Sequence, residues 1–290
     1  MRRFLISAII TLILVFSTMS TANNPSTNVL HLRFGLYTSS NPTALVRQFH
    51  PILRVIEDEL SQKLHRPVDI TINLSRTYED GIDAIVTGRV DFARFGPASY
   101  VQAKLLNPNL QLIAIETVEG GKVFYGVIVV QEGSDITTVE DLRGKSFAFG
   151  NENSTIGRYL SQLFLAKANI RVGDLASYAY LQQHDLVGLA VAMGEFDAGA
   201  LNETIFRKLA AAGQPLTEIV RFENVTKPWI ATPEMDPEVR AALEETLLEI
   251  LPNNIGARRL QITGFVRGED SDYDTIREII EQNDQFFEDE

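Results

Sequence analysis

Cysteine is absent from this 290-residue sequence, and tryptophan and methionine are scarce, with one and four residues. The absence of cysteine excludes disulfides, thiolate metal ligands, a cysteine nucleophile and the lipid-modified cysteine that tethers some exported proteins. Basic residues are in the minority, because the sequence has 26 of them and 38 acidic residues, which gives a net charge of −12. That negative charge argues against nucleic acid or an anionic membrane surface, so we expect no nucleic-acid partner.

The sequence nevertheless contains enough apolar material for a large folded protein. Hydrophobic residues make up 45% of it and charged residues 22%, a composition that excludes a disordered chain. Its length exceeds the roughly 250 residues at which a single hydrophobic core stops growing. Two lobes or domains are therefore expected.

Residues 1–22 have the pattern of a secretory signal peptide. The second and third residues are arginines, residues 4–16 form an uncharged apolar run, and Ser20 and Ala22 are small residues suited to a cleavage site. We predict cleavage after Ala22 and release of the remaining chain into a periplasm. An uncleaved membrane anchor is the alternative, because the apolar run approaches the length of a short span.

Strand and helix patterns alternate through the rest of the chain. Alternating apolar residues predict strands at 29–36 and 68–74, and helical spacing predicts a helix over 43–64. The same rhythm restarts after two apolar strands at 112–117 and 124–130. This order indicates an α/β fold whose sheets are mostly parallel and flanked by helices.

We expect two α/β lobes, with the second inserted into the first and a ligand cleft between them. Residues 28–118 and 225–290 would form lobe 1, and residues 119–224 would form lobe 2. The acidic tail that begins at Pro237 has a helical pattern. We expect this tail to pack back on lobe 1.

Motifs for catalysis and metal binding are absent from the sequence. The four histidines stand at unrelated spacings, and the sequence contains no HExxH, GxSxG, P-loop or GxGxxG motif. We therefore expect no metal site, no cofactor and no enzymatic activity. An exported enzyme that uses His184 and Glu203 as a base pair is the alternative, and a turnover assay on phosphate esters would reveal it.

Two predicted helix starts have the character of anion-binding sites. A strand within 147–158 passes through a polar loop into a helix opened by Ser154 and Thr155, and a second helix starts within 95–100, with Ser99 in its first turn. A helix N-terminus presents unpaired N–H groups and a partial positive charge. Ordinary capping would explain either start alone. Two of them at the carboxyl ends of strands would close on a small anion from opposite sides.

The order of several short segments resembles the periplasmic phosphate, phosphite and phosphonate binding proteins of ABC importers. The likeness runs from about residue 31 to 250 and rests on segments 95–100, 124–125, 141–145, 154–157, 184–191 and 196–199. The resemblance implies the type 2 periplasmic-binding fold. Ile156 stands where the Ser-Thr-Ser-Gly signature of that family has its second serine, so one hydroxyl donor is lost while the backbone N–H remains.

The resemblance also implies which residues hold a ligand. Ser154 and Thr155 would bind phosphoryl oxygens, and Tyr78 would reach the same group from the first lobe. Tyr125 is included because Phe124 replaces a tyrosine of the relatives, and His184 would lie at the cleft edge or only cap the following helix. The full expected set is Tyr78, Ser99, Tyr125, Ser154, Thr155, Ile156, Gly157, His184, Asn202 and Glu203.

Three further positions bear on the nature of the ligand. Asn202 and Glu203 fall near a carboxylate that aminophosphonate-binding relatives use for the ligand amine, with Thr204 as the alternative counterpart. Lys227 stands where such relatives carry aspartate, and its positive charge would repel an amine. The resemblance therefore implies phosphate, phosphite or an alkylphosphonate, and argues against an aminophosphonate.

Together these features predict a monomeric periplasmic solute-binding protein of an ABC importer. It would capture a small phosphorus oxyanion or phosphonate between its lobes and deliver it to an inner-membrane permease. Two alternatives retain the same fold. One is a ligand-sensing subunit for a membrane receptor or kinase, and the other is a binding protein for a small molecule without phosphorus.

Overall fold

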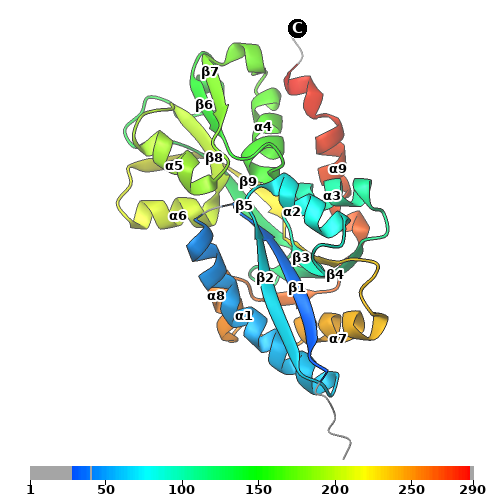
Figure 1. The fold of residues 1–290 in the computed structure, drawn as a ribbon. Coiled ribbons are helices and arrows are strands. Elements are labelled where there is room, and N and C mark those ends of the chain that lie inside the picture. The colour runs from blue at the N-terminus through cyan, green and yellow to red at the C-terminus, as the bar shows by residue number, and fades with distance from the viewer. Residues whose placement is uncertain (1–27, 40, 288–290) are drawn as a thin grey trace, which may run out of the picture.

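The computed structural model describes residues 28–39 and 41–287, and its strands form two separate sheets (Figure 1). The predicted signal peptide, residues 1–22, lies outside the described residues. The first sheet has six strands in the order β11 (Gly264–Val266), β4 (Gln111–Thr117), β10 (Pro228–Ala231), β3 (Phe92–Arg94), β1 (Leu30–Tyr37) and β2 (Val68–Ser75). We call this sheet and the helices packed on it the first lobe.

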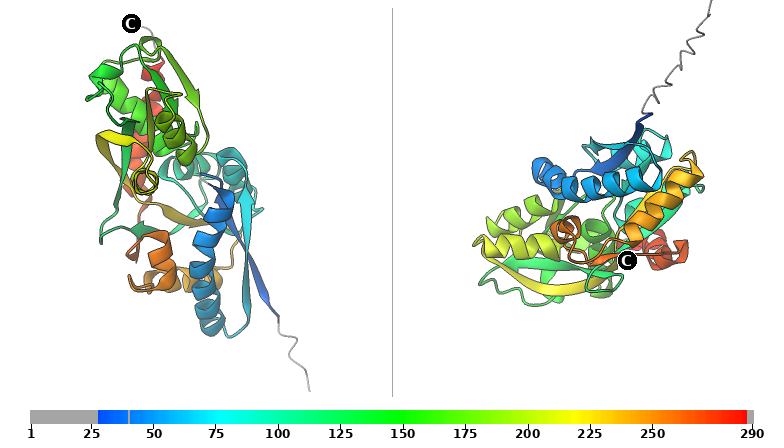
Figure 2. Two further views of the ribbon diagram at one scale, coloured as in Figure 1. Left: turned by 90° about the vertical axis from the view of Figure 1, so that its left-hand side faces the viewer. Right: turned by 90° about the horizontal axis from the view of Figure 1, so that it is seen from below.

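The second sheet lies above the first in Figure 1, and the two lobes also separate in the side view of Figure 2. Its five strands follow the order β7 (Ser177–Tyr180), β6 (Ser146–Phe149), β8 (Ala198–Asn202), β5 (Val123–Gln131) and β9 (Leu216–Val225). We call this sheet and its helices the second lobe. The two-lobed α/β architecture expected from the sequence is thus confirmed, whereas the boundaries at 118/119 and 224/225 stay a prediction.

Both sheets are mixed, so the expectation of mostly parallel sheets is wrong. In the first sheet β1 pairs in parallel with β2 and β3, but β10 is antiparallel to β3 and β4. In the second sheet β5 is antiparallel to β8 and β9. The antiparallel pairs arise because the chain crosses between the lobes twice. It enters β5 from the first lobe and β10 from the second, so each of these two strands runs antiparallel to its neighbours.

Five helices belong to the first lobe, and α1 shows why they form where they do. Asn41 caps α1 by accepting a hydrogen bond from the amide of Ala44 at 3.0 Å. The apolar residues of α1 recur at helical spacing and bury Phe49 against Phe34 of β1 and Trp229 of β10. The five helices are α1 (Pro42–Lys63), α2 (Tyr78–Val86), α3 (Pro97–Leu106), α7 (Pro237–Leu248) and α8 (Ile255–Leu260).

The helices of the second lobe include an unusual first turn. The turn η2 (Thr155–Leu160) is wound as a π-helix and continues directly into α4 (Ser161–Lys167). Its wide winding shows in the bond from the amide of Tyr159 to the carbonyl of Ser154, 3.3 Å long. Such turns are rare and are frequent at functional sites. The other helices of this lobe are α5 (His184–Ala192) and α6 (Glu203–Ala211).

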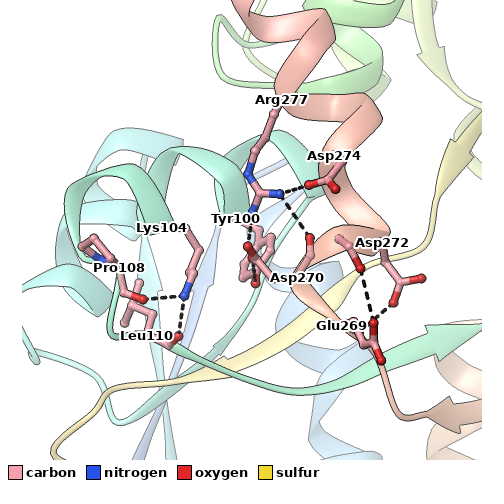
Figure 3. A network of polar contacts seen from close by, with 10 residues as sticks. Tyr100, Lys104, Pro108, Leu110, Glu269, Asp270, Asp272, Asp274 and Arg277 are labelled. Atoms are coloured by element: carbon pink, nitrogen blue, oxygen red, sulfur yellow. Dashed lines mark hydrogen bonds and ion pairs between the residues drawn. The ribbon is translucent and has the colours of Figure 1, made fainter.

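The C-terminal tail divides between the lobes, so the expectation that it packs wholly on lobe 1 is wrong in part. The helices α7 and α8 pack on α1, but α9 (Asp274–Glu281) contacts both α3 and the turn η2, and η5 (Asn283–Phe286) contacts α4. Figure 3 shows the contact with the first lobe just before α9. The carboxylate of Asp270 accepts hydrogen bonds there from Tyr100 of α3 and from Arg277. The tail crosses to the second lobe because Phe286 is buried there against Phe149.

Candidate functional site

A cavity of about 70 Å³ lies between the two lobes. Residues of the first lobe, among them Tyr37, Tyr78 and Arg94, face residues of the second lobe across it. No aspartate or glutamate of the described residues lines this cavity. Its polar lining consists of Tyr37, Ser39, Tyr78, Arg94, Ser154, Thr155, His184, Asn202, Asn224 and Lys227, and its other lining residues are Leu36, Leu45, Gly96, Pro97, Phe124 and Ile156.

The start of η2 is the most donor-rich part of this cavity. Ser154 caps the turn by accepting from the amide of Gly157 at 2.9 Å, which leaves its hydroxyl hydrogen free to donate. The amides of Thr155 and Ile156 have no acceptor within the part of the chain that the structure describes. Both residues line the cavity. Two amides, of Thr155 and Ile156, and two hydroxyls, of Ser154 and Thr155, therefore lie together at the cavity wall. Hydrogen-bond donors grouped at a helix N-terminus in this way can bind an anion.

The start of α3 faces this turn from the first lobe. The amide of Ala98 donates to the hydroxyl oxygen of Thr155 at 2.8 Å, which joins the two helix starts directly. The amide of Gly96 donates to the hydroxyl of Tyr37 at 2.7 Å. The two predicted helix starts therefore do meet at one place.

Tyr78, expected from the sequence, lines the cavity beside Tyr37, with 4.0 Å between the ring centroids. Burial raises the pKa of Tyr78 above its usual value of 10, and the neighbouring Tyr37 acts in the same direction. Tyr78 is therefore a neutral phenol at physiological pH. A neutral phenol donates a hydrogen bond without adding charge.

Ser99 and Gly157 belong to the expected set but do not line the cavity. Ser99 is fully buried behind it, with its hydroxyl 3.1 Å from that of Tyr37. Gly157 uses its amide on Ser154, and a Cβ at this position would lie 2.7 Å from the Cα of Gly150. Gly157 is thus needed for close packing of the turn.

Two cations line the cavity on the side of Phe124. Arg94 is held by both oxygens of Glu116, at 2.8 and 3.0 Å, and Glu116 also accepts from the indole of Trp229 at 3.0 Å. Burial alone would raise the pKa of Glu116, but Arg94 lowers it below its usual value. Lys227 lies over the ring of Phe124, 4.4 Å from its centroid. Burial and the charge of Arg94 lower the pKa of Lys227 to about 7.

The remaining lining residues carry polar atoms that the protein itself does not satisfy. Among the described residues, His184 Nδ1 and both side-chain polar atoms of Asn224 have no hydrogen-bond partner, although both side chains are buried. Burial and Lys227 lower the pKa of His184 to about 4, so its ring is neutral. Asn202 caps α6 through the amide of Ile205 at 2.9 Å and keeps its amide hydrogens for other partners. Buried groups of this kind are normally hydrogen-bonded.

Tyr125 and Glu203, both expected in the site, line a second cavity of about 80 Å³. Glu203 pairs with Arg207 at 2.7 Å and Arg221 at 2.9 Å, and the guanidinium of Arg221 lies 3.8 Å from the ring centroid of Tyr125. The carboxylate is therefore already neutralised by two arginines. His184 lines the first cavity, so the structure gives no support to a base pair of His184 and Glu203.

Beyond the expected set, the polar lining of the first cavity includes Tyr37, Ser39, Arg94, Asn224 and Lys227. Lys227 had a signal in the family resemblance, because it stands where aminophosphonate-binding relatives carry aspartate. Arg94 and Asn224 had no such signal, and the structure places them in the strands β3 and β9. Within the described residues no group of three or more His, Cys, Asp or Glu side chains is arranged to hold a metal ion.

Comparison with known proteins identifies the family. A family model described as "ABC transporter, phosphonate, periplasmic substrate-binding protein" matches residues 34–273. The "Probable ABC transporter phosphite binding protein PhnD1" of Prochlorococcus marinus is 26% identical over 92% of this chain and 93% of that protein. The "Phosphonates-binding periplasmic protein" of Escherichia coli is 28% identical over 65% of this chain and 55% of that protein.

A solved structure supports the same fold. The structure of PhnD1 from Prochlorococcus marinus in complex with methylphosphonate has a TM-score of 0.74 and 24% identity. The match covers 89% of this chain and 99% of the other. Since the family model spans most of the chain, this protein belongs to the periplasmic substrate-binding proteins of phosphonate ABC transporters.

Proposed function

We propose that this protein captures a phosphorus oxyanion, namely phosphate, phosphite or an alkylphosphonate, in the cavity between its lobes. The observation that carries the proposal is the start of η2 at Ser154. Two amides and two hydroxyls meet there at the cavity wall, and within the described residues these amides have no acceptor and no carboxylate lines the wall. A helix N-terminus stabilises negative charge at this point. Ser154, Thr155, Ile156 and Tyr78 form the proposed shell around the anion.

The number of donors is sufficient for useful affinity. Each hydrogen bond to a charged group contributes about 1.5–3 kcal/mol, and micromolar binding requires about 8 kcal/mol. About four such bonds account for that affinity, and the amides and hydroxyls of the proposed shell supply them. The net charge of −12 does not prevent binding, because charges farther away than about 8 Å are largely screened at physiological ionic strength.

We further propose that the protein works as a monomer in the periplasm and passes its ligand to an inner-membrane ABC permease. Family membership supports transport over the alternative of a sensing subunit. The same membership supports a binding role over an enzymatic one. Export by a cleaved signal peptide ending at Ala22 and the lobe boundaries at 118/119 and 224/225 belong to the same proposal.

Isothermal titration tests the proposal most simply. We expect methylphosphonate, phosphite or phosphate to bind with micromolar or better affinity. The alternative of a ligand without phosphorus predicts the opposite outcome, in which none of these three anions releases or absorbs heat on mixing. Native mass spectrometry of freshly purified protein would then identify the ligand that it carries instead.

A further inference from the structure

The second cavity adjoins the first, and three residues line both. Arg94, Phe124 and Lys227 form the shared wall between them. At about 10–15 Å³ for each water-sized group, the first cavity of about 70 Å³ holds about five to seven groups. Methylphosphonate, with one carbon, one phosphorus and three oxygen atoms, fits within that number. A larger substituent on the phosphorus would have to extend past Lys227 into the second cavity.

The charges on the shared wall disfavour a cationic substituent. Arg94 is balanced by Glu116, but Lys227 forms no ion pair within the described ranges. The other carboxylate at the second cavity, Glu203, is held by Arg207 and Arg221. Among the described residues, the ionic group at this wall that lacks an ion-pair partner is therefore a cation, Lys227.

Unsatisfied polar atoms of the described residues line both cavities. Asn224 lines the first cavity and is 4% exposed, and neither its amide nitrogen nor its oxygen finds a partner in the described part of the chain. Thr226 lines the second cavity and is 1% exposed, and its hydroxyl is likewise unpartnered there. Both precede Lys227 closely in the chain, just before β10. Together these residues can supply two neutral donors and one charged donor to an acceptor-rich group.

We propose that the preferred ligand is a phosphonate whose substituent carries a carboxylate, with the phosphonate on the start of η2 and the carboxylate on Lys227, Asn224 and Thr226. This inference rests on the proposed function, since it assigns the phosphonate to Ser154 and Thr155. The pKa of Lys227, lowered to about 7 by burial, supports it because a neighbouring carboxylate would restore the charged lysine. The carboxylate would supply the counter-charge that the protein does not provide.

Titration of the wild-type protein with matched ligands tests the inference. Ethylphosphonate, phosphonoacetate and 2-aminoethylphosphonate have substituents of similar size that are neutral, negative and positive. We expect phosphonoacetate to bind at least tenfold more tightly than ethylphosphonate, and 2-aminoethylphosphonate to bind more weakly than either. Lys227→Gln should abolish the advantage of phosphonoacetate while leaving the affinity for ethylphosphonate within about threefold.

A matched control removes one positive charge elsewhere. Lys208 is exposed on α6 and lines neither cavity, so Lys208→Gln should leave all three affinities unchanged. Equal loss of affinity for ethylphosphonate and phosphonoacetate in Lys227→Gln would overturn the inference, because Lys227 would then hold the phosphonate itself. Tightest binding of 2-aminoethylphosphonate by the wild type would also overturn it, even if the variant failed to fold. Failure of the phosphonates alone would overturn only the inference, whereas failure of phosphate and phosphite to bind as well would refute the proposed function.

Discussion

The hydroxyls of Ser154 and Thr155 offer the sharpest test of how the site works. The double substitution Ser154→Ala and Thr155→Ala removes two donors from the proposed shell while the amides of Thr155 and Ile156 remain. At about 1.5–3 kcal/mol for each bond to a charged group, the loss amounts to about 3–6 kcal/mol. Because about 1.4 kcal/mol corresponds to tenfold in affinity, we expect methylphosphonate to bind at least about a hundredfold more weakly.

The same substitutions have a separate cost in stability. Ser154→Ala removes the cap on the amide of Gly157, at about 1 kcal/mol, and Thr155→Ala removes the acceptor of the Ala98 amide, at a similar cost. Urea unfolding of the protein without added ligand would measure this cost. Titration calorimetry under native conditions would measure the loss of affinity.

A capping residue remote from the cavity provides the control. Asp236 caps α7 through the amide of Glu238 at 2.8 Å, and it lines neither cavity. Asp236→Ala should reduce stability by about 1 kcal/mol and leave the affinity unchanged. A double variant at Ser154 and Thr155 that kept wild-type affinity would refute the reasoning. So would an equal loss of affinity in Asp236→Ala.

Three further predictions concern charge and packing. A carboxylate on the ligand favours the protonated Lys227, whose pKa is lowered to about 7, so the affinity for phosphonoacetate should fall relative to that for ethylphosphonate as the pH rises above about 7. Titrations of both ligands across pH should show that Lys227→Gln abolishes this relative fall. Glu116→Ala leaves Arg94 without its counter-charge and should lower the free energy of unfolding by about 3 kcal/mol in urea. The contribution of Glu116, whose pKa lies below its usual 4.5, should be complete above that pH and disappear as the pH falls through the lowered value. Gly157→Ala places a methyl group 2.7 Å from the Cα of Gly150 and should reduce stability by about 1–3 kcal/mol in thermal unfolding. Unchanged stability in either variant would contradict the corresponding packing or ion-pair argument.

Local structure could be predicted well from the sequence because short-range patterns determine it. The apolar spacing of 43–64 predicted α1 nearly to its ends, and the polar loop before Ser154 predicted the start of η2. Strand direction could not be predicted in this way. Whether β10 runs parallel or antiparallel depends on the end from which the chain enters the sheet, and that is decided by the crossing from the other lobe.

The site was predictable in part for the same physical reason. Ser154, Thr155 and Tyr78 were expected from capping patterns and family likeness, and the structure places them around one cavity. Ser99 lies in the right turn but points toward Tyr37, because sequence spacing does not say which first-turn residue faces the cavity. Arg94 could not be found, since its pairing with Glu116 joins strands that only the folded sheet brings close.

A crystal structure of the protein with methylphosphonate would test the central claim most directly. We predict that the phosphonate oxygens lie within hydrogen-bond distance of the amides of Thr155 and Ile156 and of the hydroxyls of Ser154 and Tyr78. Methylphosphonate bound at another place, with the start of η2 in contact only with protein atoms or water, would contradict that claim.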